Sequence, residues 1–289
     1  MLTVFERGQL DKSGKECVLL LGGFDGIHVG HQTLFDAAKR YQKPIAITTI
    51  LGGKEGGNVF TFSERRRIFS KCGASYVYEI VFSEQLKNTT PRAFADELFS
   101  FFDVKAIVCG SDFRFGKGAQ GTPELLKEMA SVPVDVLELK KIGGEKVSST
   151  NVKKFLSEGN VQEANALLSH PYFMLGRVEH GRRVGHVLGF PTANISVPQE
   201  KFPLREGVYG GYATTAKGTF PTIINVGARP TFDVEERKIE AYLDGFDGDL
   251  YGEEICIYPT EFYRTVCKFP SIKALKEQLQ ADIRRLRND

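Results

Sequence analysis

The sequence of 289 residues has little excess of either charge and no long apolar run. It contains 38 Lys and Arg against 36 Asp and Glu, a net charge of +2 at pH 7. Because no broad basic patch stands out, nucleic acid is disfavoured as a main partner. No segment approaches the ~20 apolar residues that a membrane helix needs. Residues 1–16 contain acidic side chains and no apolar core, so we expect neither a membrane span nor a signal peptide.

Cysteine is scarce, and its spacing shows no pattern. The five cysteines lie far apart or in apolar, strand-like settings, and none of them forms a CxxC pair. An odd number without a pattern is typical of reduced thiols, so we expect a cytoplasmic protein. The five are Cys17, Cys72, Cys109, Cys256 and Cys267.

The chain is organised around residues 18–31, VLLLGGFDGIHVGH. The apolar run 18–21 predicts a strand buried on both faces. Gly22 begins a glycine turn that lets the backbone bend sharply and lets a ligand approach closely. A helix is expected from His31 onward, with Asp25 as a candidate cap. The stretch therefore predicts a strand, a glycine turn and the start of a helix.

Two histidines at the start of this helix indicate anion binding. The first N–H groups of a helix have no partners inside it and carry the positive end of its dipole. His28 and His31 are three residues apart, so they share one face if the helix has already begun at His28. When a nucleophile attacks the α-phosphate of a nucleotide, such donors neutralise the charge that builds on the phosphoryl group and on pyrophosphate. The alternatives are solvated histidines or a metal-binding pair, for which no third ligand is evident nearby.

The stretch resembles the GxFDGxHxGH signature of the nucleotidyltransferase superfamily, specifically its FMN adenylyltransferase branch. It is not a Walker loop, since no GK[ST] follows the turn, and it is not a GxGxxG dinucleotide fingerprint. The resemblance implies an ATP site that contains Gly22, Phe24, Gly26, His28, Gly30 and His31, with both histidines catalytic.

Strands and helices alternate through the first half. Such alternation is the pattern of a doubly wound parallel sheet, in which ligands bind at the carboxyl ends of the strands. We expect further strands at 44–50, 76–81, 106–109 and 134–137, and helices at 64–72 (capped by Ser63), 92–101 and 123–130.

A glycine-rich loop, residues 110–121, follows one of these strands. Arg114 can meet a phosphate, and Phe113 and Phe115 either pack under a base or flavin or belong to the core. The loop resembles the GxDFRFGxxxxG segment of the same adenylyltransferases, which implies that Asp112 and Arg114 shape the ATP site.

A cluster of small hydroxyl residues precedes the next expected helix, in VSSTNVK at 147–153. Such residues are common as simple helix caps. The cluster also resembles the family's SSTxxR motif, with lysine where arginine is usual. Lysine keeps the charge but loses the bidentate fork. The resemblance implies that four residues bind ATP phosphates: Ser148, Ser149, Thr150 and Lys153.

From about residue 170 the pattern changes to short strands between glycine turns. We expect strands within 172–181, 207–215, 220–227, 239–246 and 253–259, which form an antiparallel sheet or barrel. Two short helices within 154–169 connect the halves, so the predicted domains are 1–170 and 171–289. A closing helix, 271–286, has one apolar face for packing on the barrel: Ile272, Leu275, Leu279, Ile283 and Leu286.

The second candidate site begins in GHVLGFPTAN, residues 185–194. Thr192 and Asn194 are two apart and point the same way in an extended segment, and their oxygens suit Mg²⁺. Glu240 is the candidate general base for a phosphoryl transfer. The alternatives are an ordinary polar turn and a solvent-facing glutamate.

This half resembles bacterial riboflavin kinase through GFPTAN, EGVYGG at 206–211, NVGARPTF at 225–232, and the stretch from Glu240 to GDLYG at 248–252. With the first-half motifs, the resemblance covers nearly the whole chain and points to the bifunctional prokaryotic FAD synthetases. It implies that Thr192 and Asn194 hold Mg·ATP and that Glu240 activates the 5′-hydroxyl of riboflavin. Further ATP- or flavin-binding positions are implied at Gly176, Gly185, Gly189, Pro191 and Asn225.

Several positions depart from the family pattern. The aromatic-Pro-His-Pro motif that usually follows the second strand is replaced by TILGGKEGG, whose Lys54 can meet the FMN phosphate. Tyr242 stands where a histidine usually follows Glu240 by two, and Val266 stands where glutamate is usual. The last two changes leave the kinase motifs themselves in place, so we expect an intact kinase core. The missing motif in the first half leads us to expect an altered adenylyl site.

The sequence thus predicts an enzyme that uses ATP and Mg²⁺ to convert riboflavin to FMN and then FMN to FAD and pyrophosphate. One alternative is a riboflavin kinase with a weak adenylyltransferase domain. Another is a flavin- or nucleotide-binding regulator without catalysis, which the retained Glu240, His28 and His31 argue against.

Overall fold

The computed structural model describes residues 2–8, 12–52, 56–138, 141–142, 145–180, 189–231 and 234–288. Their contacts form two compact units, Met1–Ser149 and Thr150–Asp289. Among the helices in these ranges, none combines the length and apolarity needed to cross a membrane.

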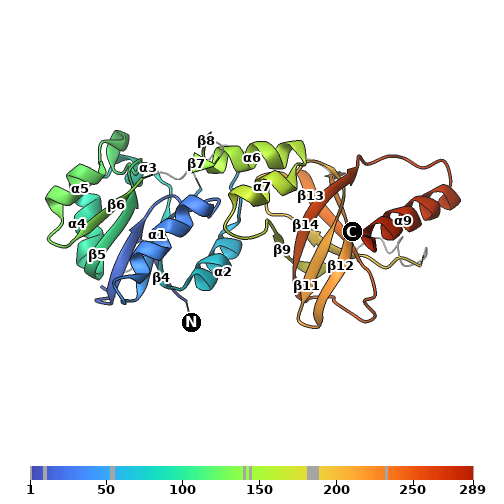
Figure 1. Cartoon of the computed structure of the whole chain (residues 1–289), viewed down its shortest axis with the longest axis horizontal. Coiled ribbons are helices and arrows are strands. Elements are labelled where there is room, and N and C mark those ends of the chain that lie inside the picture. Colours follow the sequence, from blue (N-terminus) through green and yellow to red (C-terminus); the bar gives the residue numbers. More distant parts are fainter. Residues whose placement is uncertain are drawn as a thin grey trace. The chain divides into compact units, whose positions relative to one another are not determined.

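The first unit contains a six-stranded sheet in the order β1-β4-β3-β2-β5-β6, and all neighbouring strands are parallel (Figure 1). This confirms the predicted nucleotidyltransferase-like fold. The strands are β1 Thr3–Glu6, β2 Glu16–Leu21, β3 Ile45–Leu51, β4 Ala74–Val81, β5 Asp103–Gly110 and β6 Val134–Leu137. A small hairpin, β7 Lys141–Ile142 and β8 Glu145–Lys146, follows.

Helices occupy the connections between these strands, as the alternating pattern predicts. They are α1 Val29–Lys39, α2 Phe62–Cys72, α3 Glu84–Asn88, α4 Pro91–Phe101 and α5 Pro123–Met129, with a short 3₁₀ turn at Lys117–Ala119. The edge strand β1 and the short α3 were not predicted from the sequence.

Two predicted helix starts were wrong. The helix expected from His31 begins at Val29 with His28 as its N-cap, so Asp25 does not cap it. The next helix is capped by Thr61 and not by Ser63. Thr61 accepts from the Glu64 backbone N–H while the Glu64 carboxylate accepts from the Thr61 backbone N–H. This reciprocal capping box satisfies two N–H groups, whereas a cap at Ser63 would leave that pair unmade.

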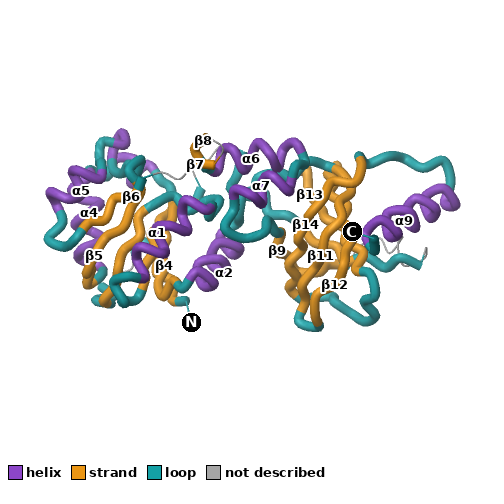
Figure 2. Tube along the Cα trace, viewed as in Figure 1, coloured by secondary structure: helices purple, strands orange, loops and turns teal. Residues whose placement is uncertain are grey.

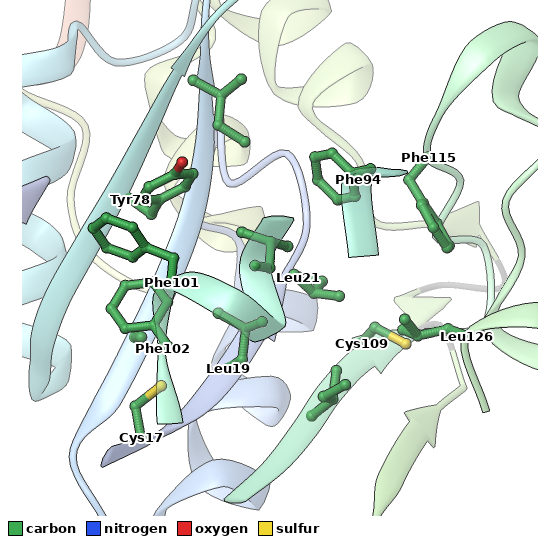
Figure 3. Close-up of a cluster of buried hydrophobic side chains, with 14 of the residues drawn as sticks. Cys17, Leu19, Leu21, Tyr78, Phe94, Phe101, Phe102, Cys109, Phe115 and Leu126 are labelled. Carbon is green, nitrogen blue, oxygen red and sulfur yellow. The ribbon is translucent and has the colours of Figure 1, made fainter. Parts of the chain in front are cut away.

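The central strand β2 is buried on both faces. Its side chains at Cys17, Leu19 and Leu21 belong to one apolar cluster with residues of α4 and α5 (Figure 3). Val18 and Leu20 alternate with them and point to the opposite face, where they are also fully buried. The uninterrupted apolar run in the sequence is thus explained by helices on both sides of the sheet.

The strand order fixes where a ligand can bind in this unit. From β2 the chain moves to β3 and β4 on one side, and β5 then pairs with the other side of β2. The switch point lies between β2 and β5, where Leu21 pairs with Cys109. In open parallel sheets, ligands bind outside the carboxyl ends of strands at such a point. The loops after β2 and β5 both begin there.

The second unit is a closed antiparallel barrel in the order β10-β13-β12-β11-β14-β9, which confirms the predicted barrel (Figure 2). Its strands are β9 Met174–Glu179, β10 Ala193–Ser196, β11 Gly207–Thr215, β12 Gly218–Thr231, β13 Val234–Leu243 and β14 Glu254–Arg264. β11 and β14 approach closely. A Cβ at Gly211 would lie 2.1 Å from the Tyr258 carbonyl, so glycine is required there, and one at Gly210 would displace the Tyr263 ring.

In the described part of this unit, the helices are α6 Ser149–Glu158, α7 Val161–Leu167 and α9 Ile272–Leu286. The first two are linked directly to the barrel. The Arg205 backbone N–H donates to the Leu156 carbonyl at 3.0 Å, and its guanidinium donates to the Glu158 carbonyl at 3.0 Å. The Tyr172 N–H donates to the Asn165 side chain at 2.7 Å. The two connecting helices therefore belong to the barrel's unit, upstream of the predicted boundary at 170/171.

These contacts predict a stability difference between two fragments. A fragment 150–289 should have a Tm at least about 5 °C above that of a fragment 171–289, because the shorter one loses α6 and α7. Leu156 and Val161 are buried, and burying one such side chain contributes about 2 kcal/mol.

Thermal unfolding followed by circular dichroism measures the difference. Equal Tm values would show that α6 and α7 add nothing to the barrel and would favour the boundary at 170/171.

Candidate active sites

The first candidate site lies at the switch point between β2 and β5. His28 caps α1, and His31 lies in its first turn, where the His31 N–H donates to the His28 carbonyl at 2.8 Å. The two imidazoles stack with ring centroids 3.8 Å apart and planes 15° apart. The predicted shared face is confirmed, and both rings lie beside the positive end of the helix dipole.

The turn from β2 to α1 is held in an unusual backbone conformation. Phe24 and Ile27 both have positive φ, 45° and 39°, and both side chains are fully buried. Each such residue costs about 1–3 kcal/mol, and this turn adjoins the two histidines. The Phe24 ring lies 4.8 Å from the His31 ring, so it packs behind that imidazole. Gly22 follows β2 directly, and Gly30 lies in the first turn of α1.

Two contacts fix this turn to neighbouring segments. The buried Asp25 carboxylate accepts from the Val59 backbone N–H at 2.8 Å, which ties it to the segment before α2. Gly26 lies against Ser149, whose Oγ would be 3.4 Å from a Cβ at that glycine. The structure therefore brings the predicted residue Ser149 to the same site as the glycine turn.

The loop after β5 places its polar and aromatic side chains differently. Asp112 and Arg114 are exposed, and the Arg114 guanidinium donates to the carbonyls of Ser111 and Phe113 at 3.3 and 2.7 Å. Phe115 is buried in the core cluster of Figure 3, with Phe113 stacked on it at 5.3 Å. The core interpretation of Phe115 is thus confirmed.

The remaining predicted residues of this site are distributed as follows. Ser148 precedes α6 in the first unit, while Thr150 and Lys153 belong to the second. There the Lys153 ammonium lies 5.5 Å from the ring centroid of Phe202. Lys54, in the loop after β3, lies outside the described residues.

The second candidate site is a cavity of about 280 Å³ between the barrel wall and α9. Its barrel side includes the predicted residues Thr192, Asn225 and Glu240. Its other side is apolar and comes from α9 and the segment that precedes it. That second set consists of Val266, Cys267, Phe269, Leu275, Leu279 and Ile283.

Glu240 lies between two asparagines on this wall. It pairs with Asn194 of β10 on one side and with Asn225 of β12 on the other. Asn194 is only 7% exposed, and its amide donates to the Thr192 carbonyl at 3.2 Å. The strand register thus brings the Glu240 carboxylate between two amide side chains that are distant in the sequence, and Thr192 lies just before one of them.

The side-chain oxygen of Asn225, Oδ1, is a buried hydrogen-bond acceptor without a donor among the described residues. A buried acceptor without a partner is costly, and a bound ligand or cation at the cavity would satisfy it. The described residues contain no group of three or more His, Cys, Asp or Glu that could hold a metal. The oxygens of Thr192, Asn194 and Asn225 nevertheless suit Mg²⁺, which takes few protein ligands beside phosphates and water.

The remaining predicted positions lie around this cavity or in the barrel. Pro191 stands between the cavity-lining residues Phe190 and Thr192, and Gly189 has a φ of 86°. Gly176 packs against Ile195, whose Cβ would be 2.8 Å from an added Cβ, so packing by itself requires this glycine. Gly185 lies outside the described residues.

Sequence reasoning missed the contribution of α9 to the site. Its apolar face was predicted only to pack on the barrel, and Ile283 does so against Val208 and Ile223. Leu275 and Leu279 line the cavity instead, and Ile272 is 66% exposed. The sequence feature that could have indicated this role is the length of the apolar face, which extends well beyond the part of α9 that packs on the barrel.

Comparisons with known proteins match the two halves of the chain to two families. A family model described as FAD synthetase matches residues 10–151, and one described as riboflavin kinase matches residues 168–289. The bifunctional riboflavin kinase/FMN adenylyltransferase of Listeria monocytogenes is 32% identical, over 92% of this chain and 90% of its own length. Those of Escherichia coli and Bacillus subtilis are each 30% identical, with the same coverage.

The chain belongs to the bifunctional riboflavin kinase/FMN adenylyltransferase family. As a member, it phosphorylates riboflavin to FMN and adenylylates FMN to FAD, with ATP as the donor in both steps. A solved structure described as the macrolide-efflux protein of Streptococcus pneumoniae is 31% identical, covers 95% of both chains and has a TM-score of 0.84. That solved structure is therefore similar to this chain over nearly its whole length.

The cavity predicts selective alkylation of one thiol. Burial, with the charges of Asp103 and Glu16, raises the pKa of Cys17 to about 12, and burial raises that of Cys109 to about 11. Both thiols therefore stay protonated and unreactive at pH 8, whereas Cys267 is exposed at the cavity wall. Iodoacetamide should label Cys267 first, and riboflavin should slow that labelling.

Mass spectrometry of the labelled protein measures both rates, with Cys267→Ser as the control that removes the fast site. Labelling that proceeds at one rate with and without saturating riboflavin would argue against riboflavin in this cavity.

Proposed function

We propose that each unit carries one of the two activities: adenylyl transfer at the switch point of the first unit and riboflavin phosphorylation in the cavity of the second. The observation that carries the kinase assignment is Glu240, held between Asn194 and Asn225 on a cavity wall. The stacked His28 and His31 at the start of α1 carry the other assignment.

In the first site, a phosphate oxygen of FMN attacks the α-phosphorus of ATP and pyrophosphate leaves. Negative charge grows on the α-phosphoryl oxygens and on the leaving group. His28, His31 and the first N–H groups of α1 are held in place before the reaction, so they stabilise that charge without reorganisation. Ser149, against Gly26, adds a hydroxyl at the same position. Ser148, Thr150, Lys153, Asp112 and Arg114 remain proposed ATP contacts.

In the second site, Glu240 accepts the proton of the riboflavin 5′-hydroxyl, whose oxygen attacks the γ-phosphorus of ATP. ADP then leaves. Thr192, Asn194 and Asn225 would hold Mg²⁺ together with the ATP phosphates, and the ion would supply positive charge against the phosphate oxygens. The orphan Oδ1 of Asn225 supports this role.

The apolar half of the cavity suits the flavin ring. Leu275, Leu279 and Ile283 of α9 face the cavity opposite the barrel wall. A flat aromatic ring system would replace water against these side chains, which is favourable at about 25 cal/mol per Å² of apolar surface. We therefore place the isoalloxazine ring of riboflavin toward α9 and its ribityl chain toward Glu240.

A weak adenylyltransferase is a second candidate, favoured by one observation. The loop after β3 lacks the aromatic-Pro-His-Pro motif, and Ile50, near the end of β3, is 38% exposed. FMN would then be positioned less firmly. Separation of FMN from FAD after incubation of wild type with riboflavin, ATP and Mg²⁺ distinguishes the two: FMN that accumulates almost without FAD supports the weak form.

Glu240→Gln should reduce FMN formation by about 10²–10⁴-fold, because the amide cannot accept the hydroxyl proton. FAD formation from supplied FMN should stay unchanged. Glu277→Gln, which alters an exposed glutamate of α9, is the matched control. Kinase turnover in Glu240→Gln that stays near wild type would remove Glu240 from the role of base.

His28→Ala and His31→Ala should each lower kcat for FAD formation by about 10²–10³-fold, because one donor to the transition state is lost. The loss should fall on kcat more than on KM. Steady-state assays with FMN and ATP measure both constants, and riboflavin phosphorylation by the same preparations is the internal control. Unchanged FAD formation in both variants would place adenylyl transfer elsewhere.

A further inference from the structure

Besides an exposed pair between Arg285 and Glu261 at 2.8 Å, two ion pairs link α9 to the barrel among the described residues. Arg264, at the end of β14, donates to Asp282 through Nη2 at 2.8 Å and Nε at 3.2 Å. Asp282 is 5% exposed and also accepts from Gln278 at 2.8 Å. At the end of the helix, Arg287 donates to Asp244. The first pair lies within the helix–barrel contact, while the second lies at the helix C-terminus.

The Arg287–Asp244 pair is bidentate. Nε donates to Oδ2 at 2.7 Å and Nη2 donates to Oδ1 at 2.8 Å. The Asp244 side chain is 10% exposed, and its backbone N–H donates to the Pro221 carbonyl at 2.8 Å. The guanidinium of Arg287 lowers the pKa of Asp244, so the carboxylate stays charged and correctly oriented at neutral pH.

The same carboxylate receives a hydrogen bond from the cavity wall. The Tyr242 hydroxyl donates to Oδ1 of Asp244 at 3.4 Å, a long bond. Tyr242 is two residues from Glu240 on β13, so both side chains lie on one face and both line the cavity. The Tyr242 ring meets Phe190 edge to face, with centroids 5.7 Å apart and planes 73° apart.

We propose that Arg287, Asp244 and Tyr242 form a positioning chain that sets the affinity for riboflavin. Arg287 holds the Asp244 carboxylate, which holds the Tyr242 hydroxyl and thereby fixes the Tyr242–Phe190 edge of the cavity. This inference rests on the proposed function, because it takes the cavity as the riboflavin site. Tyr242 and Arg287 are positioning residues and take no part in the chemical step.

The Arg264–Asp282 pair makes the proposal testable. Because it anchors the helix independently through a buried carboxylate, loss of Arg287 leaves α9 in place and frees only the Tyr242 edge. A substitution at Arg287 therefore acts on riboflavin binding rather than on folding.

The test is a double-mutant cycle on the full chain with Tyr242→Phe, Arg287→Ala and the combined variant. Riboflavin Kd is measured by quenching of its fluorescence, with KM and kcat from the kinase assay and Tm from circular dichroism. Each single variant should raise riboflavin Kd and KM about threefold to tenfold, as expected for one lost hydrogen bond. The combined variant should exceed neither single variant, because both break one chain.

Three controls accompany the cycle. Arg284→Ala removes an equal charge from the same turn of α9 and should leave riboflavin Kd unchanged. Arg287→Lys keeps the charge without the bidentate fork and should recover part of the affinity. The kinase kcat, the KM for ATP and FAD formation from FMN should all stay within about twofold of wild type, since a merely structural loss would lower them together.

Additive effects in the combined variant, unchanged riboflavin Kd, or parallel losses in kcat and in the KM for ATP would each overturn the proposal. Leu279→Trp, which fills the cavity, separates this failure from failure of the proposed site. If Leu279→Trp abolishes riboflavin binding while the cycle shows no effect, the cavity is the site and the positioning chain is wrong. If Leu279→Trp leaves riboflavin Kd unchanged, the site assignment itself is wrong.

Discussion

The tight turn from β2 into α1 is the constraint on which the first unit depends. Seven residues must reverse the chain from a buried strand to a helix that packs beside it. Phe24 and Ile27 take up left-handed conformations to do so, and both side chains are buried. Burial of the two apolar side chains offsets the conformational cost. The result is a helix that begins at Val29, with His28 as its N-cap, at the switch point between β2 and β5.

In our proposal, the barrel also binds the phosphates of ATP, but with different chemical groups from those of the first unit. By the same proposal, phosphate chemistry in the first unit relies on helix N–H groups and imidazoles, which are donors. In the second unit, the register of three neighbouring strands places Asn194 and Asn225 on either side of Glu240. Oxygen ligands of this kind suit a cation that bridges them to ATP, which fits the role proposed for Mg²⁺ at this site.

The fold could be predicted largely from the sequence, because the apolar patterns of the strands and helices are clear and glycines mark many of the turns between them. The run at 18–21 and the alternation that follows gave the parallel sheet, and β6 was predicted with its observed bounds. β1 was missed because Thr3–Glu6 is short and partly exposed, and only pairing with β4 makes it a strand. At α2, the residues for the observed cap were visible, since Glu64 follows Thr61 by three. The cavity could not be predicted, because only tertiary packing places Leu275 and Leu279 on the wall opposite Glu240. The domain boundary at 170/171 and the roles of the site residues stay predictions.

The close approach of β11 and β14 has a consequence for how relatives of this protein are recognised. Gly210 and Gly211 belong to the EGVYGG segment that carries part of the resemblance to riboflavin kinases. A side chain at Gly211 would collide with the Tyr258 carbonyl, and one at Gly210 would displace the Tyr263 ring, both on the barrel wall itself. Selection to keep the barrel closed would preserve these glycines even in a descendant that had lost Glu240. The segment is therefore diagnostic of the architecture, and inference of kinase activity in a distant homologue should depend on the residues that face the cavity.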